Sequence, residues 1–348
     1  MSSRAGSCAA APAPARYYAS PWEQWWTSHI DSRVGTVWHP DGCNALCLGP
    51  CTIPSVINNA THPISIWLRV QSEREHAPLS VSTDESHPVL SLHAYTDPCN
   101  GRVSMIPIEP LVGALRHPYH DCLKRSSMSA SKNYLLPAWR PEVLPSPART
   151  FFFDLGASLW ASGSGGASQS WFVHGYAKRG LEFDRILAWE YEQHTEIEIR
   201  RSLPAALRNA TTIYRTPDAA PPGCAQCASD RLSYHNFGID AIEGSLRNPL
   251  VHLRALVRPD DFVVIKLDVD TPAIELAVVE QILRDPVNTG ALIDEFYWEH
   301  VVAHTPMEHF GWGHDLRRLP KEKQQTLRDS YSYFTRLREM GIRAHSWV

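Results

Sequence analysis

The second half of the chain alternates short apolar runs with amphipathic segments, which predicts β-strands separated by α-helices. Several of the runs are continuously apolar, as expected for strands buried on both faces. This alternation is typical of βαβ units and of a mostly parallel sheet with helices on both faces. The predicted strands are 150–154, 185–190, 233–240, 261–268, 293–299 and 342–348, and the predicted helices are 165–179, 246–257, 271–284 and 321–340.

The first half has a different pattern. From residue 17 to about 145 it is rich in Pro, Trp and His, and only short alternating runs at 64–70 and 89–95 predict half-buried strands. A segment rich in Pro and Ser at 141–147 predicts a domain boundary. We therefore expect an α/β chain with a disordered or targeting tail at 1–21, an irregular N-terminal accessory region at 22–147 and a Rossmann-like domain at 148–348.

Composition removes some classes of partner. The formal net charge of −4 over 348 residues gives no field that attracts nucleic acid or anionic lipid. No apolar run approaches the roughly 18 residues of a membrane span, so a soluble chain is expected. The Ala/Pro/Ser-rich start resembles an organelle-targeting or disordered tail. Eight cysteines and the sequons at Asn59 and Asn209 would also fit a secretory lumen, so the compartment stays open.

Acidic side chains end or directly follow several predicted strands. They are Asp154, Glu190, Asp240, Asp268 and Glu299. In an open parallel sheet, ligands bind beyond the carboxyl ends of the strands, so these acids should line one cleft. An acid after a strand can also cap the next helix, but helix caps do not explain acids that precede long loops.

The turn after the first of these strands reads Asp154-Leu155-Gly156-Ala157-Ser158. Gly156 has no Cβ, which lets a ligand approach the backbone. An acid in this turn suits a cationic or hydrogen-donating ligand and repels pyrophosphate. Glu190, at the tip of the next strand, is placed to accept hydrogen bonds from the two hydroxyl groups of a ribose.

Four motifs in order carry a family resemblance: Phe152-Phe153-Asp154-Leu155-Gly156-Ala157, Ala188-Trp189-Glu190, Ile265-Lys266-Leu267-Asp268-Val269-Asp270 with Glu275, and Trp298-Glu299-His300. Together they resemble the FkbM-type family of S-adenosylmethionine-dependent methyltransferases, in particular a divergent eukaryotic or algal branch. The resemblance covers roughly residues 148–348. It implies a class I methyltransferase sheet with S-adenosylmethionine as cofactor.

In that resemblance Asp154 and Gly156 lie near the methionine part of the cofactor and Glu190 binds the ribose. The cofactor-binding residues expected from it are Asp154, Gly156, Ala157, Ser158, Glu190 and Asp240. Two features depart from the family pattern. The loop after Gly156 is longer than usual, and Asp270-Thr271-Pro272 replaces the usual Glu-Gly step.

Methyl transfer needs a positioned acceptor and a group that takes its proton. His300 is the first candidate for this base, because imidazole accepts a proton near neutral pH. Asp268 and Asp270 are the second choice, and Lys266 lies two residues before Asp268 on the same strand face. The expected reaction is O-methylation of a hydroxylated acceptor, either a small molecule or a glycan or lipid, and neither the acceptor nor the oligomeric state can be read from the sequence.

Several alternatives stay open. Asp268 and Glu299 with His300, His304, His309 and His314 would give a divalent-metal site, but these histidines fall in an apparent loop and no metal is expected. Cys224 and Cys227 form a lone CxxC in a Pro- and Gly-rich loop, which leaves a disulfide, half of a zinc site or no special role open. A noncatalytic S-adenosylmethionine-binding module is possible, because fold alone does not establish activity. The segment 163–166 loosely resembles the glycine-rich turn of NAD(P)-dependent oxidoreductases without the full motif.

Overall fold

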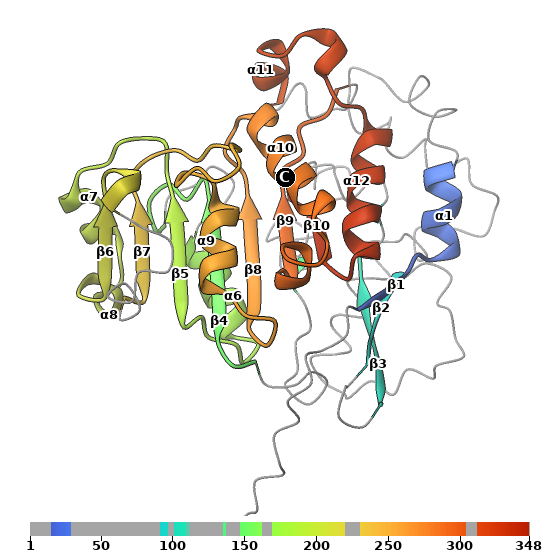
Figure 1. Cartoon of the computed structure of the whole chain (residues 1–348), viewed down its shortest axis with the longest axis horizontal. Coiled ribbons are helices and arrows are strands. Elements are labelled where there is room, and N and C mark those ends of the chain that lie inside the picture. The colour runs from blue at the N-terminus through green and yellow to red at the C-terminus, as the bar shows by residue number, and fades with distance from the viewer. Residues whose placement is uncertain are drawn as a thin grey trace, which may run out of the picture.

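The computed structural model describes residues 15–28, 91–96, 101–109, 111, 135–136, 147–161, 169–219, 230–303 and 312–347. Within them, the second half of the chain builds a parallel sheet of seven strands in the order β10-β9-β8-β4-β5-β7-β6 (Figure 1). The strands are β4 (Thr150–Leu155), β5 (Arg185–Trp189), β6 (Thr211–Tyr214), β7 (Leu232–His235), β8 (Phe262–Leu267), β9 (Glu295–Trp298) and β10 (Arg343–Ser346). The predicted α/β class with a parallel sheet is confirmed, and the arrangement is compatible with a Rossmann-like fold.

Helices cover both faces of the sheet. They are α6 (Gln169–Ala177), α7 (Glu196–Ser202), α8 (Ala205–Arg208), α9 (Pro249–Leu256), α10 (Pro272–Arg284), α11 (Trp312–Arg317) and α12 (Leu327–Glu339). Phe152 of β4 packs on Phe172 of α6, whereas Phe153 stacks on Trp189, which meets His252 of α9. Neighbouring residues of a strand point to opposite faces, so α6 and α9 lie on opposite sides of the sheet.

The six predicted strands of this half are present, with shorter bounds in places. The third ends at His235 instead of at residue 240, because the chain enters a turn organised by Asp240. The last predicted helix begins at Leu327 rather than at 321, since Thr326 caps it in a capping box with Asp329. The strand β6 and the helices α7 and α8 were not predicted, although Thr195 and Glu198 form a capping box at the start of α7.

The described N-terminal residues form a second, antiparallel sheet of β1 (Arg16–Tyr18), β2 (Ser91–Thr96) and β3 (Val103–Ile108), next to the helix α1 (Pro21–Ser28). The predicted strand at 89–95 corresponds to β2. The predicted strand at 64–70 and the two cysteines of the CxxC motif lie outside the described residues. The predicted tail at 1–21 is described only from residue 15 on, and there Arg16–Tyr18 forms β1 instead of a disordered segment.

A buried ion network joins this small sheet to the large one. Its members are Glu23, Glu109, Glu295, Arg338, Arg343 and His345, and each is at most 3% exposed. Arg338 of α12 pairs with Glu109 at 3.0 Å and with Glu23 at 3.6 Å. His345 of β10 lies 2.9 Å from Glu109 and 2.6 Å from Glu295, which also pairs with Arg343. Residues far apart in the sequence are thus held together by charge in the interior.

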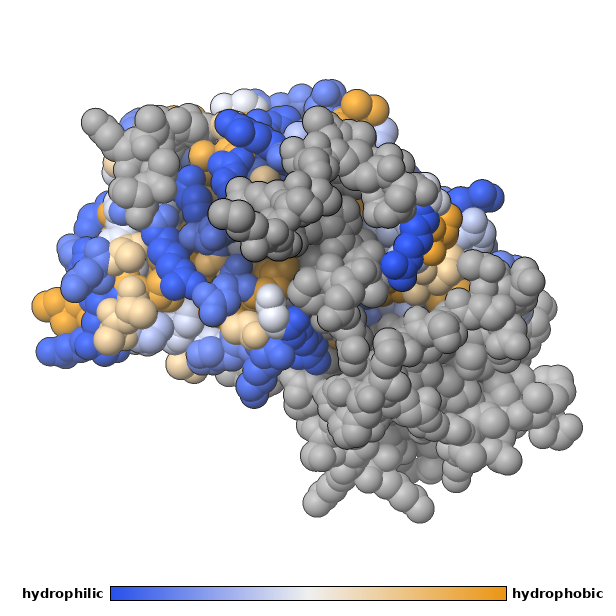
Figure 2. All heavy atoms as spheres, turned by 90° about the horizontal axis from the view of Figure 1, so that it is seen from below, coloured by the Kyte–Doolittle hydropathy of each residue, from blue (hydrophilic) through white to orange (hydrophobic). Residues whose placement is uncertain are grey.

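The described surface seen in Figure 2 carries mostly hydrophilic residues with scattered hydrophobic ones. Large exposed apolar side chains occur at Tyr18, Val103, Tyr191, Ile197, Ile242 and Val287. Among the described helices, none has the length and apolar character that crossing a membrane requires.

Candidate functional site

The strand order places a topological switch point between β4 and β8. From β4 the chain continues to β5 on one side, and it later crosses to β8 on the other side of β4. In open α/β sheets the ligand crevice lies at the carboxyl ends of the strands at such a point. The acids that the sequence places at strand ends should therefore meet there.

Asp154 and Lys266 occupy neighbouring strands at this point. They are register partners in β4 and β8, so both side chains point to the same face of the sheet. Nζ of Lys266 lies 3.5 Å from Oδ1 of Asp154 and 3.2 Å from Oδ2 of Asp268. Asp154 is 1% exposed, and its Oδ1 accepts no hydrogen bond from the described residues. Burial raises the pKa of Asp154 to about 6, with Lys266 opposing the rise.

The loop after β4 comes into backbone contact with the loop after β8. Gly156 has a φ of +85°, and a Cβ on it would lie 1.7 Å from the carbonyl oxygen of Asp268. Lys266 donates to the carbonyl of Gly156 at 2.7 Å. The N–H groups of Gly156 and Ala157 both bond to the carbonyl of Trp189. Glycine is therefore required at this position by both space and conformation.

Glu190 follows β5, directly beside this loop. Its Oε2 accepts from the backbone N–H of Ser158 at 2.5 Å, and its Oε1 accepts from that of Glu192 at 2.7 Å. Tyr234 of β7 holds the same loop by donating to the carbonyl of Ser158 at 2.8 Å. Asp154, Gly156, Ser158 and Glu190, all predicted site residues, thus come together at one edge of the sheet.

Tyr191 is a candidate site residue that the sequence analysis did not consider. Its side chain is 84% exposed although it directly follows Glu190. A Cβ on Gly238 would lie 2.9 Å from its ring, so the ring lies against the backbone that follows β7. An exposed aromatic ring next to a strand-end acid offers a flat surface for a planar ligand. The position of Tyr191 directly after Glu190 is the sequence feature that could have identified it.

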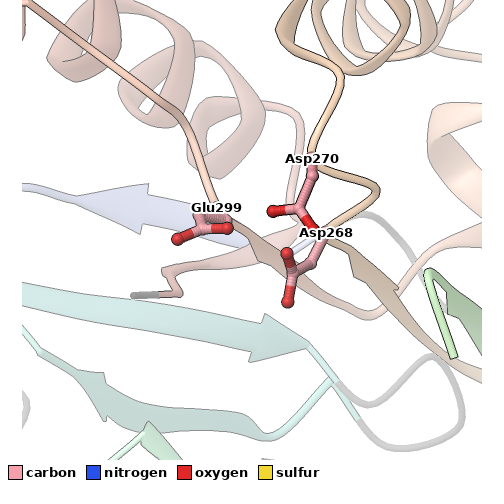
Figure 3. Close-up of side chains that lie close together, drawn as sticks. All are labelled: Asp268, Asp270 and Glu299. Carbon is pink, nitrogen blue, oxygen red and sulfur yellow. The ribbon is translucent and has the colours of Figure 1, made fainter. Parts of the chain in front are cut away.

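Three carboxyl groups gather at the ends of β8 and β9. Asp268 and Asp270 follow β8 and Glu299 follows β9, and one oxygen of each lies within 4.8 Å of the others (Figure 3). We call these three residues the acidic cluster. Burial, followed by the charge of Asp268, raises the pKa of Glu299 well above its usual range. Burial and Asp268 also raise the pKa of Asp270.

Burial opposes the positive charge of Lys266, but Asp268 and Asp154 outweigh it and raise the pKa of that ammonium group. Lys266 is therefore charged at neutral pH. The described residues place this cation among several acids. The surplus of carboxylates favours a ligand with positive charge or with hydrogen-bond donors.

His300 does not join the acidic cluster. It is 3% exposed, its Nδ1 lies 2.9 Å from Oγ of Ser330 on α12, and its ring stacks on Trp298 at 3.9 Å. Alternation along an extended chain sends the neighbouring residues Glu299 and His300 to opposite faces. The role of His300 as base stays a prediction, and the structure places its ring against Trp298 and Ser330, apart from the acidic cluster.

Two other predicted cofactor-binding residues, Asp240 and Ala157, direct their side chains to neighbouring parts of the protein. Both carboxylate oxygens of Asp240 bond within its own turn, to the N–H of Ile242 and to the hydroxyl of Ser245. The side chain of Ala157 is 3% exposed and belongs to the core. The predicted contact of Asp240 with the cofactor stays a prediction.

The metal alternative takes a different form in the structure. His304 and His309 lie outside the described residues, and His314 is a largely exposed residue of α11 beside Asp315. The three acids of the cluster are close enough for one cation to contact all of them. Carboxylate oxygens are the ligands that hard divalent cations prefer. Three neighbouring carboxylates do not show whether a metal binds, so the expectation of no metal stays a prediction. The glycine-rich segment 163–166 also lies outside the described residues.

Comparison of the chain with models of protein families, with curated proteins and with solved structures finds no match.

Proposed function

We propose that the protein is an S-adenosylmethionine-dependent methyltransferase that acts on a hydroxyl group of its acceptor. The observation that carries the proposal is the convergence of Asp154, Gly156 and Glu190 at the switch point, with the acidic cluster beside them. The resemblance to FkbM-type methyltransferases agrees with this placement. An uncharged acceptor suits the surplus of acidic groups.

The residues present fit this cofactor. The carboxylate of Asp154 is a partner for a donor such as the amino group of the methionine part, and its Oδ1 lies 3.5 Å from Nζ of Lys266. Glu190 keeps lone pairs for ribose hydroxyls, because each carboxylate oxygen can accept more than one hydrogen bond. The exposed ring of Tyr191 would pack on the purine.

S-adenosylmethionine supplies an electrophilic methyl group on a sulfonium centre when it is bound. Asp268 takes up the proton that the acceptor hydroxyl loses as its oxygen bonds to the methyl carbon and the bond from that carbon to sulfur breaks. Burial raises the pKa of Glu299 well above its usual range and so favours its protonated form, which is why the proposal assigns the proton to Asp268. Lys266 keeps Asp268 in place through the contact at 3.2 Å.

The acids argue against a pyrophosphate cofactor. A dinucleotide would bring two further negative charges next to Asp154 and the acidic cluster, in a partly desolvated crevice. The NAD(P)-dependent alternative therefore has weaker support, although a parallel sheet of this order also suits such cofactors.

Titration calorimetry with S-adenosylmethionine and with NAD(P) tests the proposal. We expect binding of S-adenosylmethionine, and about 10–100-fold weaker binding in Glu190→Ala, because two charge-assisted hydrogen bonds to the ribose are lost. Glu192→Ala is the matched control, since Glu192 is an exposed acid two residues further on. Transfer of a labelled methyl group to a panel of hydroxylated small molecules, glycans and lipids then tests catalysis.

Three outcomes separate the alternatives. Binding of NAD(P) without S-adenosylmethionine would overturn the proposal. Binding of S-adenosylmethionine without transfer to any acceptor would identify a noncatalytic binding module. An equal loss of affinity in Glu190→Ala and Glu192→Ala would remove Glu190 from the site.

A further inference from the structure

Two indole N–H groups hold the carboxylates at the centre of the acidic cluster. Nε1 of Trp312 donates to Oε1 of Glu299 at 2.8 Å, and Nε1 of Trp347 donates to Oδ2 of Asp268 at 3.2 Å. Trp312 begins α11, and Trp347 directly follows β10. Each carboxylate is thus held from an element other than its own.

Both indole rings are fixed by packing. Trp312 is 3% exposed and packs with Val301, Val302 and Leu316 in a small separate cluster. Trp347 is 2% exposed and meets Phe172 at 5.0 Å in the main core. Rings held in this way cannot turn their N–H groups elsewhere without breaking the packing, so the two donors are rigid.

An indole N–H donates and cannot accept, so it takes no part in exchanging a proton with the carboxylates. Its effect is geometric. A carboxyl group fixed at one oxygen has the position of its second oxygen fixed as well. With Oδ2 of Asp268 also in contact with Lys266, the two indoles determine which oxygens face the interior of the cluster.

We propose that Trp312 and Trp347 are positioning residues: their N–H groups orient Glu299 and Asp268 so that Asp268 can receive the proton of the acceptor. The inference rests on the proposed methyl transfer. It adds to that proposal a contribution from α11 and from the residue after β10, neither of which belongs to the strand ends that form the crevice.

The chain contains a matched control. Trp298 makes the same kind of bond, from its Nε1 to Oε2 of Glu275 at 3.2 Å, and it is also fully buried. The other oxygen of Glu275 accepts from the backbone N–H of Val269 at 3.0 Å. Glu275 is therefore closed by local bonds and is outside the acidic cluster.

The test compares Trp312→Phe and Trp347→Phe with Trp298→Phe. A second version of the Trp312 variant carries β-(3-benzothienyl)alanine, which keeps the bicyclic shape and lacks the N–H. With the acceptor found in the panel, we expect kcat to fall about 10–100-fold in the Trp312 and Trp347 variants, the range seen when outer hydrogen-bond partners of a site are removed. The affinity for S-adenosylmethionine should stay unchanged.

The pH profile distinguishes positioning from a general structural effect. Removing a donor from a carboxylate raises its pKa, so the acidic limb of the kcat profile should move to higher pH in Trp347→Phe, which loses the donor to Asp268, and stay in place in Trp298→Phe. An equal loss of kcat in all three variants, or full activity of the benzothienyl variant, would overturn the inference.

A measurement without cofactor separates this inference from the proposed function. In protein labelled with ¹⁵N at its indoles, the Trp312 signal should shift in Glu299→Gln and the Trp347 signal in Asp268→Asn. Absence of both shifts overturns the positioning role, whatever the activity. Shifts as expected in a protein that neither binds S-adenosylmethionine nor transfers methyl groups would overturn the proposed function and leave the hydrogen bonds established.

Discussion

Two groups of charged side chains among the described residues differ in burial and in the balance of their charges. The ion network that joins the two sheets sets the acids Glu23, Glu109 and Glu295 against the bases Arg338, Arg343 and His345. The acidic cluster has Lys266 as the cation in contact with it. A balanced group satisfies itself, whereas an unbalanced one stores repulsion that a proton or a ligand can relieve. The difference indicates structure in the first group and function in the second.

The strongest test of the comparison neutralises an acid in the balanced network. Glu109→Gln removes the charge that faces Arg338 and His345, both 0% exposed. Removing one partner of a buried ion pair costs about 3–5 kcal/mol. We expect the free energy of unfolding to fall by that amount, measured by urea denaturation. A loss below about 1 kcal/mol, the range of exposed ion pairs, would show that the network is not structural.

The pH dependence of stability is expected to differ between the ion network and Glu275, a buried acid that lies outside the acidic cluster but is influenced by the charge of Asp268. Burial, followed by the charge of Asp268, raises the pKa of Glu275 to about 8. Between the ordinary value of 4.5 and about 8, the folded protein keeps a proton that the unfolded chain releases, so stability falls as pH rises. Burial opposes the charge of His345, but Glu109 and Glu295 raise its pKa, so its contribution is complete below 6.5 and is lost above it.

Urea denaturation at several pH values separates the two contributions. Glu275→Gln should remove a total change of roughly 3–5 kcal/mol in the free energy of unfolding across this window, because one pKa unit corresponds to about 1.4 kcal/mol. His345→Gln should flatten the pH dependence only above 6.5. The slope is the readout, because either change also alters stability at every pH. The same slope in Glu275→Gln and in the unsubstituted protein would contradict the assignment.

The smallest effect has the opposite sign. Asp270→Asn makes the same chemical change as Glu109→Gln but removes a like charge from the acidic cluster. Asp270 has a φ of 51°, a conformation that asparagine tolerates. We expect a gain of roughly 0.5–1 kcal/mol in the free energy of unfolding together with lower activity, as for other functional sites that are not optimal for stability. A loss of stability would show that Asp270 is paired structurally.

The sequence predictions that were confirmed rested on patterns among residues that are close together in the sequence. The run Phe151-Phe152-Phe153 and the acids after the strands were readable from neighbouring residues, and so the parallel sheet and the row of Asp154, Glu190 and Asp268 were predicted. The separation of His300 from the acidic cluster was also readable locally, because alternation along the chain sends it and Glu299 to opposite faces.

Other features depend on residues that are distant in the sequence. Glu109 and His345 lie 236 positions apart, and no periodicity connects them. The bond from Trp312 to Glu299 depends on how a short helix returns to the sheet. Such contacts follow from tertiary packing, which sequence pattern does not encode locally.

The close approach of Gly156 to Asp268 has a consequence for movement and for engineering. The loops after β4 and β8 meet backbone to backbone with no room for a single methyl group, so they cannot hinge against each other at this point. Any closure around a ligand must therefore come from other segments. A library that redesigns acceptor preference should keep position 156 as glycine and vary residues away from this contact.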